Sequence, residues 1–569
     1  MKSGIGSPTR VGLLVSLALP AMMGCDIIVN IGEYCVVGKD EGCGTGASGG
    51  AGGTSTTGST TTNGGGGTGG MPTSSSGGIG GAAPCTPGMM QTCYGGPANT
   101  EGVGACKAGQ QTCDENGEWG VCEGEVQPVA ETCGTMADED CDAYECALWA
   151  AAYGDSDFQS PSDVVIDADG NIIVVGVFKG TMTFGAVELS AAGGYDLFIA
   201  KLQPDGGVAW AKQFGNSADQ LPASAAVDGD GNIFLAGPLT GAVNFDGMSL
   251  SSSGGTDAFV AKLNPQGTTA WAKRLGDAAN QTANDLDVDS DGNVLVIGEF
   301  AGTIMLQTTV TASNGTDLWV AKFNGSDGSI ISQFVLDDKT AQPFARALQI
   351  AAGPAGTWLM AGRHGANTSI GTSTFPTGGV FLAKFDGNNT STWQKSFPLN
   401  ASTAVLVDDA SNVWVGGDFY NTIQIGTNSL NSGGGADLAI IRVEGATGNV
   451  GWAKSFGGSG DEYEPRLALS SSGGAYFVVQ TNGSMIDFGG ETLVGKGLTD
   501  FCVVALNSDG SHSWSRIIGD ATAQANPFIA TDSTLKYLAL TATSSGTVKF
   551  GEKEVTSQGN DVLVARLAP

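Results

Sequence analysis

Side chains that could carry catalysis are scarce in this chain. It contains two histidines, His364 and His512, which lie far apart in the sequence and belong to no motif. A Ser-His-Asp triad, a three-histidine zinc site or a histidine acid–base pair is therefore poorly supported. We interpret both histidines as exposed strand or loop residues, and nothing else in the sequence argues strongly for an enzyme.

One short acidic segment has the spacing of a cation site. Residues 138–142 read Asp-Glu-Asp-Cys-Asp, so that Asp138, Asp140 and Asp142 alternate and can offer carboxylate oxygens to a hard cation such as Ca²⁺. An acidic, solvated turn closed by disulfides explains the same residues without a metal. We therefore expect no required cofactor, and Ca²⁺ is the ion that this segment would suit.

A set of polar residues returns at matching places along the carboxy-terminal part of the chain. Most are glutamines that follow a glycine by five residues, as Gln159 follows Gly154. The full set is Gln159, Gln220, Gln281, Gln342, Glu464 and Gln524. A ring of such side chains could hold a polar ligand such as a glycan. The alternative, which we favour, is that a repeated polar residue satisfies backbone groups of a scaffold.

The amino terminus carries the signals of export. A positively charged start precedes the apolar run 11–23, which is too short for an ordinary membrane-spanning helix, so we interpret residues 1–24 as a signal peptide. Gly24 and Cys25 at its end resemble the lipobox of bacterial lipoproteins, a family that is cleaved before this cysteine and acylated on its sulfur. The resemblance implies a lipid anchor on Cys25, and ordinary signal cleavage is the alternative.

Ten further cysteines are clustered before residue 147, whereas Cys502 stands alone in an apolar segment. An even, clustered number indicates a disulfide framework formed in an oxidising compartment. The ten are Cys35, Cys43, Cys85, Cys93, Cys106, Cys113, Cys122, Cys133, Cys141 and Cys146. Cys35 and Cys43 are near enough in sequence to pair with each other, and the sequence does not choose among the pairings of the other eight.

Composition changes twice along this amino-terminal part. After a short lipidated segment, 25–43, residues 44–84 are almost wholly Gly, Ser, Thr and Ala, which predicts a disordered, flexible linker. Residues 85–146 form a small cysteine-rich module. Its segments GVGACKAGQQTC and WGVCEGEVQP resemble a module of secreted myxobacterial proteins, whose usual D-N-D-C-D-G segment is described as metal-binding. Here Ala143 replaces the closing glycine of that segment.

From residue 147 onward, one unit recurs. Its tryptophans Trp149, Trp210 and Trp271 are 61 residues apart, and Ile331 takes this place in the third unit. An aspartate opens an apolar strand such as DLFIAKL at 196–202, where the Asp and Lys point to opposite faces and are expected to make inter-unit contacts. Turns of the form D-x-D-G-N also recur. We interpret them as ordinary turns, since three acidic ligands are too few for Ca²⁺.

Each unit reads as four short strands, and such units in radial array are propeller blades. The last unit lacks its fourth strand, while 147–153 is a tryptophan strand without a unit of its own. We therefore predict an all-β, seven-bladed β-propeller over 147–569, closed by its amino-terminal strand, with Trp149 beside the strand 561–567. The motifs resemble the bacterial β-propeller repeat family with D-x-F-V-A-K-L strands and D-x-D-G-N turns, whose members are secreted or surface proteins.

Charge narrows the choice of partner. The chain has 57 acidic and 25 basic residues, and this net charge of −32 disfavours nucleic acid. We expect an exported protein, lipid-anchored at the cell envelope in the outer membrane or at the cell surface, whose propeller is a non-catalytic binding or scaffold module for a protein or a glycan. The long connections after the second and fourth strands mark the expected ligand face. The alternatives are a secreted carboxylate-dependent hydrolase or lyase, and a Ca²⁺-binding surface protein.

Overall fold

The computed structural model describes residues 85–568, apart from 98–99, 104, 130–140, 142–146, 221–223, 337–344, 371–372, 409, 484, 533 and 551–552. These residues divide into two compact units. One unit contains the β-propeller, and the other contains the paired strands of the cysteine-rich module.

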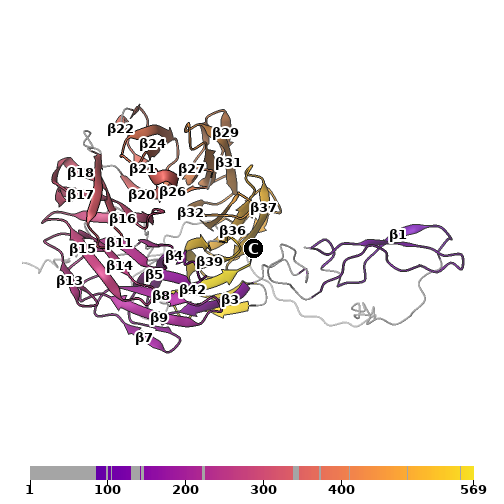
Figure 1. Cartoon of the computed structure of the whole chain (residues 1–569). Helices are drawn as coiled ribbons and strands as arrows, with labels where there is room; N and C mark the ends of the chain where they lie inside the picture. Colours follow the sequence, from indigo (N-terminus) through magenta and orange to yellow (C-terminus); the bar gives the residue numbers. More distant parts are fainter. Residues whose placement is uncertain are drawn as a thin grey trace, which may run out of the picture. The chain divides into compact units, whose positions relative to one another are not determined.

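The predicted propeller is present, with seven blades of four antiparallel strands arranged in a ring (Figure 1). We number the strands of a blade from the centre outward. Blade one is β4 (Gln159–Ile166), β5 (Ile172–Phe178), β8 (Asp196–Leu202) and β9 (Val208–Phe214). Blade two is β10 (Ser224–Val227), β11 (Ile233–Leu239), β14 (Asp257–Leu263) and β15 (Thr269–Leu275). Blade three is β16 (Gln281–Val288), β17 (Val294–Met305), β18 (Thr309–Phe323) and β19 (Ile330–Leu336). Blade four is β20 (Ala345–Ala352), β21 (Trp358–His364), β24 (Gly379–Phe385) and β25 (Ser391–Phe397).

The remaining blades repeat this order. Blade five is β26 (Ala401–Val407), β27 (Val413–Phe419), β30 (Asp437–Val443) and β31 (Val450–Gly458). Blade six is β32 (Glu462–Leu469), β33 (Ala475–Thr481), β36 (Asp500–Leu506) and β37 (His512–Ile518). Blade seven is β38 (Gln524–Thr531), β39 (Leu538–Ser544), β42 (Asp561–Leu567) and β3 (Ala147–Tyr153).

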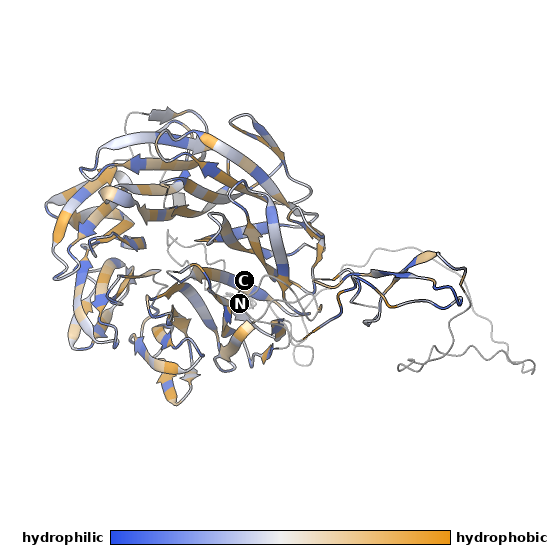
Figure 2. Cartoon of the chain, turned by 45° about the vertical axis from the view of Figure 1, so that its right-hand side comes forward, coloured by the Kyte–Doolittle hydropathy of each residue, from blue (hydrophilic) through white to orange (hydrophobic). Residues whose placement is uncertain are grey.

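The composition of the strands explains where the core lies. The second and third strands are rich in Val, Ile and Phe, and in blade one every residue of β5 and β8 is buried, whereas the outer strand β9 is partly exposed. Orange, hydrophobic residues recur along the strands of the ring in Figure 2. Seven apolar clusters result, one between each pair of neighbouring blades. Burial of apolar surface between blades therefore holds the ring together.

Ring closure follows the prediction. Strand β3 pairs with β42, with Trp149 opposite Arg566, so that the first strand of the array completes the last blade. The indole Nε1 of Trp149 and the Nη1 of Arg566 each donate to the carbonyl of Pro204 in blade one, both at 2.9 Å. The seam between the ends of the array is thus built like the other blade junctions.

The repeated tryptophans connect five of the blades to the blade that follows. Trp210 Nε1 donates to the Pro265 carbonyl at 3.1 Å, and Trp271 Nε1 donates to the Gly325 carbonyl at 3.2 Å. In each case the acceptor is in the turn between the third and fourth strands of the following blade. Trp393 and Trp452 make the same contact. The tryptophan therefore recurs because it both fills the blade junction and satisfies a turn carbonyl.

The long connection after the second strand contains a small hairpin, which we did not predict. In blade one, β6 (Thr181–Phe184) and β7 (Val187–Ser190) pair, and alternate residues of β6 are buried. The corresponding hairpins are β12 (Ala242–Phe245) with β13 (Met248–Ser251), β22 (Thr368–Ile370) with β23 (Ser373–Phe375), β28 (Thr422–Ile425) with β29 (Asn428–Asn431), β34 (Met485–Asp487) with β35 (Leu493–Val494), and β40 (Thr547–Phe550) with β41 (Lys553–Thr556). In blade three the hairpin is a continuation of β17 and β18. The labels β7, β13, β22 and β29 lie toward the outside of the ring in Figure 1.

The cysteine-rich module contains the antiparallel pair β1 (Met90–Cys93) and β2 (Gly109–Thr112). The described cysteines form three disulfides, Cys85–Cys113, Cys93–Cys122 and Cys106–Cys141. Cys502 is a buried free thiol in β36, as its apolar strand predicted. Cys25, Cys35, Cys43, Cys133 and Cys146 lie outside the described residues.

Candidate functional site in the central channel

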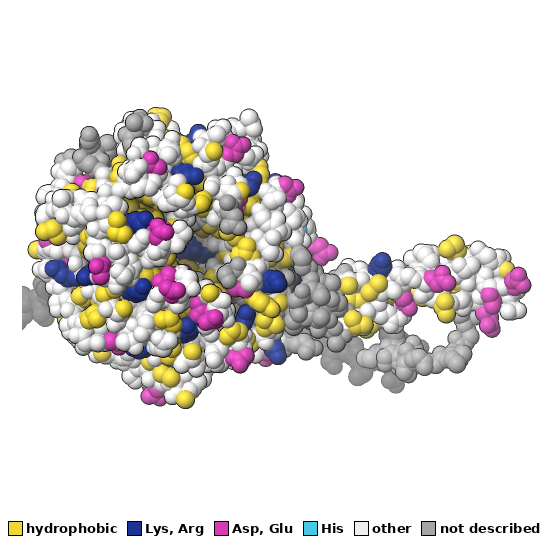
Figure 3. Space-filling model, in the orientation of Figure 1, with side chains coloured by type: hydrophobic (Ala, Val, Ile, Leu, Met, Phe, Trp, Pro, Cys, Tyr) yellow, Lys and Arg dark blue, Asp and Glu magenta, His cyan; other side chains and the backbone are white. Residues whose placement is uncertain are grey.

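The first strands of the blades surround the centre of the ring, where Figure 3 shows a hollow with Lys or Arg atoms in its depth. Each first strand presents one residue at the same register, opposite the fourth residue of the second strand. Asp163 opposite Val175 and Arg466 opposite Val478 are examples. This channel ring consists of Asp163, Ser224, Asp285, Gln349, Ala404, Arg466 and Phe528. Its seven members include acidic, basic, amide, hydroxyl and apolar side chains, so this position does not repeat.

On one side of the ring a serine joins two carboxylates. Ser224 Oγ lies 3.1 Å from Asp163 Oδ2 and 2.9 Å from Asp285 Oδ1. The serine has one hydroxyl proton, so it can donate to only one of them at a time. The Ala225 amide donates to Asp163 Oδ2, and the Ile350 amide donates to Asp285 Oδ2, both at 2.9 Å. These carboxylates therefore satisfy edge N–H groups of the next blade.

Protonation of this side is poised near neutral pH. Burial, together with the nearby Asp163 carboxylate, raises the pKa of Asp285 to about 7 despite the Ile350 amide. Burial likewise raises the pKa of Asp287 to about 6, although the Ala352 amide donates to its Oδ2 at 2.8 Å. When Asp163 or Asp285 is protonated, that carboxyl can donate a hydrogen bond to Ser224 Oγ while the serine donates to the other carboxylate.

Blades six and seven contribute a basic and an aromatic side chain to the ring. The Arg466 guanidinium lies over the Phe528 ring, with its Cζ 5.0 Å from the ring centroid. Its Nη1 donates to the Pro465 carbonyl at 3.2 Å. The charge of Arg466 also acts on Asp163, lowering the pKa of that carboxyl against the larger effect of its burial. Acids and a guanidinium therefore face one channel.

The predicted glutamine positions are occupied by buried side chains that bind loops of the scaffold. Gln159 Nε2 donates to Asp155 Oδ1 at 2.8 Å and to the Lys179 carbonyl at 3.1 Å. Gln281 and Gln524 bind Asp277 and Asp520 in the same way. Gln220 donates to the Ala218 and Thr240 carbonyls, both at 3.1 Å. Gln342 lies outside the described residues.

In the sixth blade, Glu462 takes the place of the glutamine, whereas Glu464 occupies a bulge with a positive φ of 56°. Glu462 is fully buried and accepts from Thr481 Oγ1 and from the Gly458 amide, both at 2.9 Å. Burial raises the pKa of Glu462 to about 7. The five-residue offset from Gly457 in the sequence was the signal that identifies Glu462 rather than Glu464.

The D-x-D-G-N segments form turns, as predicted. Asp167 Oδ1 accepts from the amides of Asp169 and Asn171 at 3.0 and 2.9 Å, and its Oδ2 pairs with Lys201 Nζ at 2.8 Å. Lys201 Nζ also reaches the Pro265 carbonyl of blade two at 3.4 Å, the inter-blade contact expected of this residue.

One histidine differs from expectation. His364 is buried, and its ring reaches Ser396, with Nε2 and Oγ 2.7 Å apart. Its Nδ1 lies 2.8 Å from the Gly365 carbonyl, and burial lowers its pKa. His512 is half-buried, with its Nε2 3.0 Å from Ser515 Oγ.

The described residues leave the predicted cation segment untested. The candidate cation ligands Asp138, Asp140 and Asp142 lie outside them. Across the described residues, no three His, Cys, Asp or Glu side chains converge as metal ligands would. No described helix has the length and apolar character needed to cross a membrane.

The channel ring escaped the sequence-based prediction because its members share no residue type. Its signal was positional. Asp163, Ser224, Asp285 and Ala404 each stand four residues before the first aspartate of a D-x-D-G-N or related turn. A search for repeated residues passes over a column in which identity changes and only the spacing stays constant.

Some known proteins are similar to parts of this chain. No family model matches the chain. An uncharacterized WD repeat-containing protein of Acanthamoeba polyphaga mimivirus is 25% identical over 273 residues, which cover 39% of this chain and 19% of that protein. The chain thus spans about a fifth of the length of this curated relative.

Solved structures similar to the chain include several propellers. BamB from Moraxella catarrhalis has a TM-score of 0.30 at 13% identity, covering 71% of this chain and 82% of its own. The propeller of Dos1 has a TM-score of 0.39 at 9% identity, covering 74% and 96%. The propeller domain of the Trilobed protease from Pyrococcus furiosus has a TM-score of 0.37 at 9% identity, covering 70% and 96%.

Proposed function

We propose that this chain is a cell-surface lipoprotein whose propeller is a non-catalytic module for binding a protein or a glycan. The observation that carries the proposal is the distribution of exposed apolar side chains. The described propeller residues include seven large exposed ones, and six of them lie in connections between second and third strands. These six, the hairpin rim, are Met248, Met305, Tyr420, Met485, Val494 and Leu498, which are 37% to 64% exposed.

Exposed apolar side chains gathered on one kind of loop support a contact with another macromolecule. Blade six has three of them, and Met485 and Val494 face each other across the pair β34–β35. Methionine, valine and leucine favour a protein ligand over a glycan at this rim, since such side chains cannot hydrogen-bond to sugar hydroxyls.

The repeated polar side chains support a scaffold role for the rest of the blade. The tryptophans, the third-strand lysines and the glutamines bind neighbouring turns and loops, as described above. The residues that differ most between blades lie in the hairpins and in the channel ring. Export and a lipid anchor on Cys25 remain part of the proposal, and the three disulfides are consistent with an oxidising compartment.

Protein and glycan arrays probed with the full-length chain test the proposal. A double variant, Met485→Asp with Leu498→Asp, should lose the captured protein, because it places charge on the rim of blade six. Ile331→Asp is the matched control, since Ile331 is also exposed but lies on an outer strand. Equal binding of the captured protein by both variants would contradict the proposal that the hairpin rim binds it. Hydrolysis of a polysaccharide or ester panel, abolished by replacing one acidic residue, would contradict the non-catalytic role.

A further inference from the structure

The channel ring has the character of a ligand site more than of a scaffold. Side chains that support the blades recur at the same position in most blades, whereas the ring changes from acid to serine, amide, alanine, arginine and phenylalanine. Asp163, Asp285, Arg466 and Phe528 are half-buried in the middle of their strands. Second strands and neighbouring blades cover the other sides of these residues, so their exposed surface is directed toward the centre of the ring.

Arg466 provides the anchor of this site. A guanidinium has five N–H donors, and among the described residues the one hydrogen bond shown for it goes to the neutral Pro465 carbonyl. Its planar fork suits a carboxylate, which it can bind through two parallel hydrogen bonds. The adjacent Phe528 ring orients the guanidinium and adds an apolar surface beside it.

Asp163 in blade one and Asp285 in blade three provide hydrogen-bond acceptors. Each Asp285 oxygen accepts one described hydrogen bond, from Ser224 or from the Ile350 amide, and a carboxylate oxygen has a second lone pair to offer. Burial raises the pKa of Asp285 to about 7, which reduces the negative charge that an anionic ligand would meet at neutral pH. This side therefore suits hydroxyl donors on a ligand whose own charge lies at Arg466.

We propose that the channel ring binds a uronic acid residue, a sugar with one carboxylate and several hydroxyls. Its carboxylate pairs with Arg466, its hydroxyls donate to Asp163 and Asp285, and the C–H face of its ring lies beside Phe528. Polar groups that fix the orientation of a ligand, beside an aromatic surface, are common features of a small-ligand site. This site is separate from the hairpin rim, so that either proposal can fail without the other.

Calorimetric titration of the full-length chain with glucuronate, glucose and acetate tests the site. Glucuronate should bind, and the two partial ligands should bind at least about tenfold more weakly, since each lacks one half of the recognised groups. Glucose binding as tightly as glucuronate would overturn the role of the carboxylate. Acetate binding as tightly would show an anion site without sugar recognition, and no binding of glucuronate would overturn the proposal outright.

Variants locate the binding. Arg466→Met keeps the apolar stem and should weaken glucuronate at least about tenfold, because the charge-assisted pair is lost. Arg516→Met, on the outer strand β37, is the matched control and should bind as the parent does. If Arg466→Met does not fold, Arg466→Lys keeps the charge without the fork and should give intermediate affinity. Unchanged affinity in a folded Arg466 variant would overturn the assignment.

Discussion

At the scale of single residues, one position departs from the repeat in a way that affects stability. At the glutamine position of blade six, a glutamate replaces an uncharged amide inside the protein, and Glu462 has no basic neighbour that forms an ion pair with it among the described residues. Burial of a carboxylate without a counter-charge is unfavourable, which is why the pKa of Glu462 rises to about 7. The repeat therefore contains one position that titrates inside the physiological range.

Replacing this side chain should make the protein more stable in mild alkali. The folded-state pKa of Glu462 lies above its unfolded value, so its stabilising contribution is present below about pH 4.5 and is lost as the pH rises through about 7. Glu462→Gln should therefore raise the free energy of unfolding at pH 8 by about 2 kcal/mol and change little at pH 4. Urea denaturation at both pH values measures this. An equal gain at both would assign the effect to packing instead of charge.

Asp285 and Asp287 have raised pKa values of about 7 and about 6, so they contribute with the same sign as Glu462. The Glu462→Gln variant should consequently retain a weaker loss of stability between pH 5 and pH 8. Asp285 and Asp287 account for part of that remaining slope, together with other buried carboxyls whose pKa is raised, such as Asp196 and Asp437.

Strands and turns were the most predictable level of this protein. Valine- and isoleucine-rich runs mark the second and third strands, and Asp, Asn and Gly mark the turns, because these residues act locally. The hairpins at the rim were missed since strands of four residues, such as TMTF in β6, give too short an alternation to stand out inside a loop. His364 was misjudged because its partner Ser396 is 32 residues away in the sequence, on β25.

The tryptophan contact is an element-level device with a measurable contribution. Trp271→Phe removes the hydrogen bond to Gly325 and part of a buried ring, so that we expect a loss of about 2 kcal/mol in the free energy of unfolding. Lys262 Nζ still donates a hydrogen bond to the Gly325 carbonyl at 2.9 Å, which limits the loss of stability. Ile331→Val at the exceptional position of blade three should have almost no effect. Chemical denaturation compares the two, and similar losses would contradict a special role for the indole.

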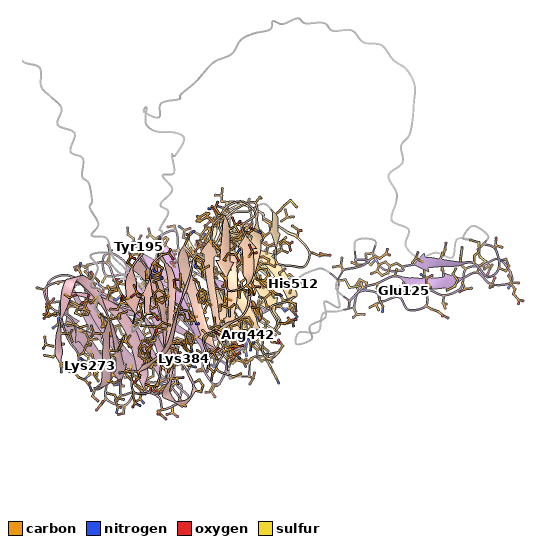
Figure 4. The ribbon with its side chains drawn as sticks, turned by 90° about the horizontal axis from the view of Figure 1, so that it is seen from above. Glu125, Tyr195, Lys273, Lys384, Arg442 and His512 are labelled. Atoms are coloured by element: carbon orange, nitrogen blue, oxygen red, sulfur yellow. A yellow bond between two sulfur atoms is a disulfide. The ribbon has the colours of Figure 1, made fainter. Side chains whose placement is uncertain are left out.

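At the scale of the whole molecule, the two faces of the propeller differ. Figure 4 shows the ring from the side, with Tyr195 on one face and with Lys273 and Lys384 on the opposite face. Tyr195 precedes a third strand, on the side of the hairpin connections, whereas Lys384 reaches the Gly445 carbonyl in a tight turn of blade five at 2.9 Å. The regular turns thus occupy one face, and the long connections that we predicted as the ligand face start from the other.

Closure of the ring should be essential for a monomeric protein. Deleting residues 147–153 removes β3 and exposes the edge of β42, whose backbone groups can then pair with another molecule. We expect the deleted chain to form oligomers and to unfold at a lower denaturant concentration, as size-exclusion chromatography and denaturation would show. Trp149→Phe, which keeps the strand, should remain monomeric. A monomeric deletion variant of unchanged stability would contradict the importance of this seam.

The same seam affects how the protein reaches its native state. Most contacts of a blade join strands that are near in sequence, and these can form quickly and independently. The pairing of Trp149 with Arg566 joins residues 417 positions apart (566 minus 149). During synthesis, β3 is made first and therefore stays unpaired until β42, the last strand of the array, has been made. The open chain is the form most exposed to misassembly, and the time spent in it is set by the length of the array.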